Sequence, residues 1–100
     1  MTTEQKIQYI ADHYGYESQS RQLIEEMAEL TVAINKAWRK TFDAVDKLPN
    51  MDDEERIEEE IADVEIMLSQ IKYLLGVEER ELSRIVESKL YRQIERIKQE

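Results

Sequence analysis

The sequence predicts an all-α protein, an antiparallel bundle of about four helices per subunit that oligomerises through helix faces. Two glycines and one proline are the only strong helix breakers among its 100 residues, and the helix-favouring residues Glu, Lys, Gln, Ile and Leu are abundant. Two segments, 23–38 and 57–72, place apolar residues at steps of four, three and four, which is the spacing of one helix face. The length predicts a single domain over residues 1–100.

Signals at helix ends divide the first half of the chain into two helices. Thr2 followed by Gln5 forms a capping box that opens a first helix of about three turns, and Gly15 is expected to end it. After a short link, Ser18 or Ser20 is expected to cap a second helix that runs to about residue 40 or 42. A link this short favours antiparallel packing of the helices that it joins.

The second half begins with the only stretch that has loop chemistry, residues 43–53, which contains the single proline. Asp52 with Glu55 forms a second candidate capping box, so a third helix is expected from about residue 53 to residue 75, with Gly76 as its stop. Acidic residues at 78 and 79 suit the start of a fourth helix, because the N-terminal end of a helix carries a partial positive charge.

Composition excludes several classes of partner. A net charge of −9 argues against a nucleic-acid polymer, although it allows a single nucleotide whose phosphates meet carboxylates through metal ions. The absence of cysteine excludes disulfides and thiolate metal sites, and no segment has signal-peptide character or membrane-spanning length. We therefore expect a soluble, cytoplasmic protein without a membrane partner. Three apolar residues outside the main stripes indicate a second subunit: Val32, Ile66 and Leu74.

Four acidic residues occupy matching positions beside the two apolar stripes. Glu26 and Glu29 lie beside the first stripe, and Glu60 and Asp63 take the corresponding positions beside the second. At about 100° per residue, each pair lies on the flank of its stripe. If the two helices pack stripe against stripe, the four carboxylates line one cleft beside the seam.

Such a cleft suits a magnesium–polyphosphate site. Mg²⁺ prefers carboxylate oxygens, retains several waters and takes substrate phosphates to complete its octahedron. In a chain with 23 acidic residues most acid pairs are solvated surface, but the matched placement favours a site, because like charges held together are destabilising without a counterion. A di-iron bundle would need Glu-x-x-His on two helices, and the single histidine, His13, lies outside both pairs.

The two acidic segments also resemble a known family. EEMAEL followed by EEIADV resembles the E-x-x-E … E-x-x-D signature of the MazG-like all-α nucleoside triphosphate pyrophosphohydrolases. The likeness covers most of the chain. YGYESQSRQLIEEMAEL is similar to the family's entry into its first metal helix, and IADVEIMLSQIKYLLGVEERELSRIVESKL is similar to its second metal helix, glycine break and final helix with a lysine. Two features depart from the pattern: the insert at 30–59 is long, and Gln93 stands where relatives often have asparagine.

The resemblance implies Mg²⁺-dependent hydrolysis of a nucleoside triphosphate to the monophosphate and pyrophosphate, in nucleotide-pool sanitation or control, by a homodimer or homotetramer. Mn²⁺ is expected to substitute for Mg²⁺. The acids implied to bind the metal and to serve catalysis are Glu26, Glu29, Glu60 and Asp63. The proton acceptor stays open among these four and Glu25, which would act through a water.

Several other side chains are candidates for substrate contact. The resemblance implies a phosphate-contacting row on the last helix, formed by Lys89, Gln93 and Arg96, and a glutamine before the first metal helix, Gln19. From spacing alone, Gln22 lies one turn before Glu26 on the same flank and can reach ribose, base or a metal-bound water; a merely exposed glutamine is the alternative. Trp38 can stack on a base or anchor the core or an interface.

Two other functions are compatible with the sequence. A non-enzymatic helical interaction module would explain the heptad-like stripe of the third helix. A relative within the same family could act on another phosphoanhydride, such as phosphoribosyl-ATP.

Overall fold

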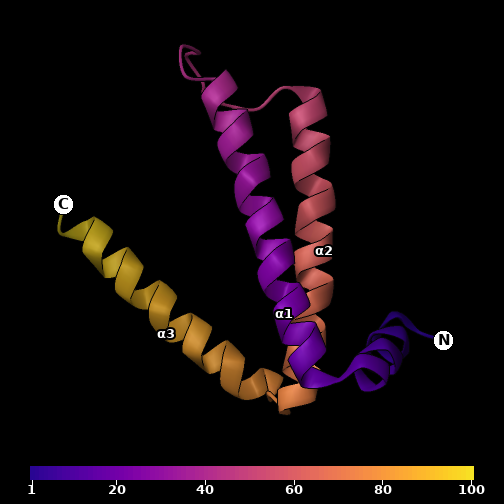
Figure 1. Cartoon of the computed structure of the whole chain (residues 1–100). Helices are drawn as coiled ribbons and strands as arrows, with labels where there is room; N and C mark the ends of the chain where they lie inside the picture. The colour runs from indigo at the N-terminus through magenta and orange to yellow at the C-terminus, as the bar shows by residue number, and fades with distance from the viewer.

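The computed structural model describes all 100 residues and contains three helices and no strand. Helix α1 spans Thr3–Lys40, α2 spans Met51–Leu75, and α3 spans Glu79–Lys98. Figure 1 shows α1 and α2 side by side as a hairpin, with the part of α1 before its kink and the whole of α3 leaving the base of the hairpin in different directions. The prediction of an all-α fold is confirmed.

The first two predicted helices form one element with a break inside it. The Thr2–Gln5 capping box is confirmed: each residue's side chain accepts a hydrogen bond from the other's backbone N–H. Gly15 has φ 84° and ψ 170°, a non-helical conformation that interrupts α1. No linker follows it, and the predicted serine caps are wrong, because the Ser18 hydroxyl donates to the Gln19 side chain and the Ser20 hydroxyl to the Glu17 carbonyl.

The start of α2 differs from the predicted capping box. Asn50 is the N-cap, and its side-chain oxygen accepts a hydrogen bond from the Asp53 backbone N–H at 2.8 Å. The Asp52–Glu55 pair is therefore not the cap, because Asn50 already satisfies the free N–H of the first turn and moves the helix start to Met51. The predicted stop is confirmed: Gly76 ends α2 in the left-handed conformation, with φ 66°.

The seam between α1 and α2 is narrow and partly polar. Its buried apolar side chains are small or slender, which lets the two helices approach each other closely. Three of its buried positions are polar, and one of them is an acid. The residues buried along this seam are Ala33, Ala37, Val64, Met67, Gln19, Glu60 and Gln70.

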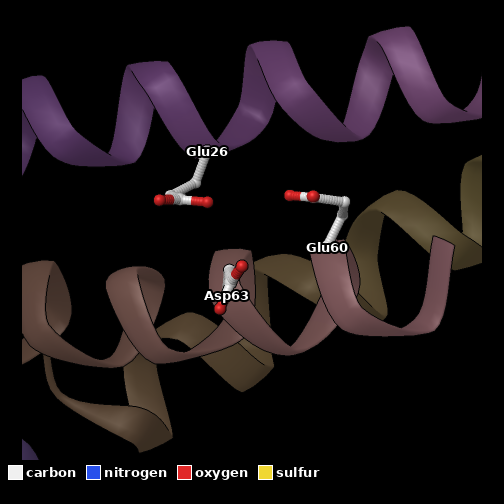
Figure 2. A group of neighbouring side chains, drawn as sticks. All are labelled: Glu26, Glu60 and Asp63. Carbon is white, nitrogen blue, oxygen red and sulfur yellow. The ribbon is translucent and has the colours of Figure 1, made fainter. Parts of the chain in front are cut away.

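Part of the apolar stripe predicted to form the seam lies beside it instead. The four side chains concerned are between 40% and 47% exposed: Met27, Ile34, Ile61 and Leu68. Glu26 and Glu60 point across the seam in their place (Figure 2), and the residue that follows each acid is turned by about 100° toward one flank. The predicted stripe-to-stripe packing with acids beside it is therefore wrong in this respect, and the hairpin keeps an exposed apolar flank.

Helix α3 packs against neither of the other helices. An ion pair between Lys72 and Glu79, 3.0 Å long, spans the turn before it, and beyond that point the helix runs free of the hairpin (Figure 1). The radius of gyration is 17.1 Å, against about 13 Å for a compact domain of this length. The predicted four-helix bundle is therefore not completed within one chain. None of the helices combines the length and the apolar character that crossing a bilayer requires.

Candidate metal centre

Three carboxylates from two helices converge at one level of the hairpin. Figure 2 shows Glu26 extending from α1 toward α2, where Glu60 and Asp63 lie one turn apart. One carboxylate oxygen from each of the three lies within 4.8 Å of the others. Around a cation whose ligands lie at about 2.0–2.6 Å, adjacent and opposite ligand oxygens are roughly 3–5 Å apart. The three acids thus have the separation that a shared hard cation needs.

Each helix directs one unpaired, buried carboxylate oxygen into this space. Glu60 is only 5% exposed; its Oε1 accepts a hydrogen bond from Arg56 Nε at 3.1 Å, while its Oε2 is buried without a partner. Glu26 is half-buried; its Oε1 accepts from Gln22 Nε2 at 2.8 Å, and its Oε2 is also buried without a partner. A desolvated charged oxygen that lacks a donor is strongly destabilising. A bound cation would relieve both of these oxygens at once.

The fourth predicted acid, Glu29, lies next to this trio and is exposed. The negative charge of Glu26, and secondarily that of Glu60, raises the pKa of the Glu29 carboxyl above its ordinary value of 4.5. Repulsion of this kind is expected where several carboxylates share a small space without a counterion. Asp63 is exposed, so the cluster opens to solvent on that side.

The donor set fits a hard divalent cation. The ligand atoms are all carboxylate oxygens, and neither histidine nor cysteine lies in the cluster, which favours Mg²⁺ or Mn²⁺ over softer metals. The arrangement leaves part of the coordination sphere to water or to a phosphate. Such a centre can neutralise a polyphosphate, which the net charge of −9 would otherwise repel.

The hairpin contains two of the predicted substrate-contacting glutamines, in different surroundings. Gln22 is half-buried and bound to Glu26, so it positions a carboxylate of the cluster. Gln19 is buried on the seam, where its Nε2 donates to Gln70 Oε1 at 2.7 Å and its Oε1 accepts from the Ser18 hydroxyl. Both polar atoms of the Gln19 amide are therefore engaged within the protein.

Trp38 and the row on α3 lie away from the three acids. Trp38 is 54% exposed near the end of α1 and packs edge-to-face on Phe42, with ring centroids 5.7 Å apart. The α3 row is exposed, and together with Arg92 it outlines a surface depression of about 230 Å³: Lys89, Arg92, Gln93 and Arg96. Within one chain this row is not brought to the acids, because α3 does not pack on the hairpin.

Sequence reasoning missed three residues that shape this centre. Arg56 holds Glu60, and its position one turn before that acid was a signal in the spacing. Lys36 lies on the same flank of α1 as Glu29, two turns further along, and lines a cavity with Arg56. Gln70 binds Gln19 across the seam, and no spacing rule distinguishes it from a surface glutamine.

Comparison of the chain with protein-family models, with curated proteins and with solved structures finds no match.

Proposed function

We propose that this protein is a Mg²⁺-dependent nucleoside triphosphate pyrophosphohydrolase. The observation that carries the proposal is the convergence of Glu26, Glu60 and Asp63, in which two buried carboxylate oxygens from facing helices have no partner. The resemblance of EEMAEL and EEIADV to the MazG-like signature supports the same function from the sequence. In the reaction, water adds to the α-phosphorus, the bond from that atom to the bridging oxygen breaks, and pyrophosphate leaves.

In this proposal the protein's own residues hold and orient the ligands. Glu26, Glu60 and Asp63 would bind the metal, and Glu29 lies beside them. Gln22 and Arg56 fix one oxygen of Glu26 and one of Glu60, which leaves the second oxygen of each aimed at the shared space. A bound divalent ion supplies charge neutralisation at the phosphates and lowers the pKa of a water.

Product analysis with matched variants tests the proposal. The protein is incubated with a panel of nucleoside triphosphates and Mg²⁺, and release of pyrophosphate is distinguished from release of phosphate. Glu60→Gln removes a charge without changing volume and is expected to lower turnover by at least about 100-fold, as loss of a key electrostatic group at a reacting centre does. Glu59→Gln, one residue away and exposed, is the control and should retain activity. Full activity in Glu60→Gln would refute the metal assignment.

We also propose that the protein assembles as a homodimer or a dimer of dimers, which would complete a helical bundle. Two apolar surfaces lack a partner within the chain: the flank of the hairpin at Met27 and Ile61, and the face of α3 at Val86 and Leu90. An amphipathic helix with a free apolar face is normally covered by another element.

A non-enzymatic interaction module is the second candidate, and the free apolar face of α3 is the observation that favours it. Such a module predicts no turnover and no change of melting temperature with Mg²⁺ and nucleotide. An enzyme predicts a rise in melting temperature with Mg²⁺ and nucleotide, because ligands that bind only the folded state stabilise it.

A further inference from the structure

A cavity of about 410 Å³ opens between α1 and α2 next to the acid cluster. Two of its lining residues interact directly with acids of the cluster. Glu29, whose pKa is raised by Glu26 and Glu60, lies in its wall, and so does Arg56, whose Nε lies 3.1 Å from Glu60 Oε1. The other lining residues are Ala28, Val32, Ala33, Lys36 and Asp53. The cavity therefore continues the acid cluster along the hairpin, toward the 41–50 connection.

The charges of this cavity change along its length. Lys36 forms no ion pair with any carboxylate of the chain. Arg56 uses only Nε on Glu60, so the remaining N–H groups of its exposed guanidinium are free. Asp53 also lines the cavity; its Oδ1 pairs with Lys40 Nζ at 3.1 Å, and its Oδ2 is buried without a hydrogen-bond partner. The carboxylates of the acid cluster thus lie at one end of the cavity, and two cations with free donors, Lys36 and Arg56, line it together with Asp53.

We infer that this cavity binds the pyrophosphate end of the substrate, with Lys36 and Arg56 as its cationic contacts. The inference rests on the proposed function. A metal on the acids takes only a few phosphate oxygens, and the terminal phosphates carry most of the remaining negative charge. Charge-assisted hydrogen bonds from an ammonium and a guanidinium suit these phosphates. The nucleoside would then extend from the acid cluster in the direction away from this cavity, past Gln22.

The hairpin thereby supplies phosphate contacts that do not depend on α3. The α3 row containing Lys89 is remote from the acids within one chain, whereas Lys36 and Arg56 adjoin them. Lys36 is the more informative of the two for a test. Because Arg56 also holds Glu60, its substitution would disturb the metal ligands as well as the phosphates.

Binding of inorganic pyrophosphate to the full-length protein, measured by calorimetry in the presence of Mg²⁺, tests the inference. Lys36→Met is expected to weaken pyrophosphate binding by roughly tenfold, the effect of losing one charge-assisted hydrogen bond. Its affinity for Mn²⁺ alone should stay within about twofold of the wild type, because Lys36 is not a metal ligand. Lys6→Met, which removes an exposed and equally unpaired lysine of α1, should bind pyrophosphate like the wild type.

The outcomes separate the inference from the proposed function. Unchanged pyrophosphate affinity in Lys36→Met, or a wild-type protein that binds Mn²⁺ but no pyrophosphate, overturns the inference and leaves the metal centre standing. Weaker binding of a nucleoside monophosphate, with pyrophosphate binding unaltered, also overturns it. If pyrophosphate binding depends on Lys36 but no triphosphate is hydrolysed, the inference holds and the proposed reaction falls.

Discussion

Gln19 on α1 donates a hydrogen bond from Nε2 to Oε1 of Gln70 on α2, at 2.7 Å, and both side chains are almost fully buried, at 6% and 2% exposure. A polar pair inside a helix–helix seam is satisfied only when the two helices keep one register. In this register Glu26 faces Glu60. The two glutamines therefore lock the alignment in which the acids meet.

Replacing Gln70 tests this lock. Gln70→Leu leaves the buried amide of Gln19 without its partner and is expected to lower the free energy of unfolding by about 1–3 kcal/mol. The double variant Gln19→Leu/Gln70→Leu removes both polar groups and should regain much of that loss, since no unpaired amide remains. Urea unfolding followed by circular dichroism measures both. Equal stability of the single variant and the wild type would show that the pair is not buried in solution.

The raised pKa of Glu29 predicts a pH dependence of the metal-free protein. A carboxyl whose folded-state pKa lies above its unfolded value contributes stability at low pH, and this contribution is lost as pH rises through the folded-state pKa. With EDTA present, the wild type should therefore gain thermal stability relative to Glu29→Gln as the pH falls from neutral through the raised pKa of Glu29. The test is the melting temperature of each protein, measured as a function of pH. If the difference between the two melting temperatures is the same at every pH, the charges of Glu26 and Glu60 do not raise the pKa of Glu29.

Replacement of Gly15 by any other residue is expected to destabilise the protein. Its φ of 84° with ψ of 170° lies in a region that is essentially restricted to glycine, and holding another residue there costs about 1–3 kcal/mol. A Cβ at this position would touch nothing, so the loss in Gly15→Ala is due to the backbone alone. Gly76→Asn is the control, because asparagine accepts the left-handed conformation found there. Denaturant unfolding of the two variants compares the losses.

Much of the fold could be predicted because helix ends depend on local chemistry. The Thr2–Gln5 box and the Gly76 stop involve residues within one turn of each other, and both are confirmed. The identity of the second cap was missed because Asn50 and Asp52 are both good caps, and only the path of the incoming loop decides between them. Spacing also selected the acids that meet. Spacing placed these acids on the flank of the seam, whereas Glu26 and Glu60 point across it. The seam itself is formed by small residues such as Ala33 and Ala37, which apolar periodicity does not single out.

Other long-range relationships could not be predicted. The periodicity of α3 shows that one of its faces is apolar and is expected to be buried, but it does not identify the element that buries it. The Gln19–Gln70 bond joins residues 51 positions apart, and each glutamine alone resembles an exposed helix residue. The effect of Gly15 was also ambiguous, because a glycine can end a helix or redirect it without a linker.

Assembly through α3 predicts a difference between two sides of one helix. Leu90→Glu places a charge on the exposed apolar face of α3 and is expected to convert the protein to a monomer, as measured by sedimentation velocity. Ser88→Glu adds the same charge about 200° around the helix, away from that face, and should leave the assembly intact. A wild-type protein that sediments as a monomer at micromolar concentration would contradict the proposed assembly.

Nine of the 100 side chains are buried in a single chain, and four of these nine are polar. So small an interior leaves little free energy to hold an isolated copy together, since most of the hydrophobic effect is gained only when the remaining apolar surface is covered. In the proposed assembly, folding and association become one equilibrium, and dilution favours the unfolded chain. We expect the midpoint of thermal unfolding to rise with protein concentration, as it does for obligate oligomers and does not for self-sufficient domains.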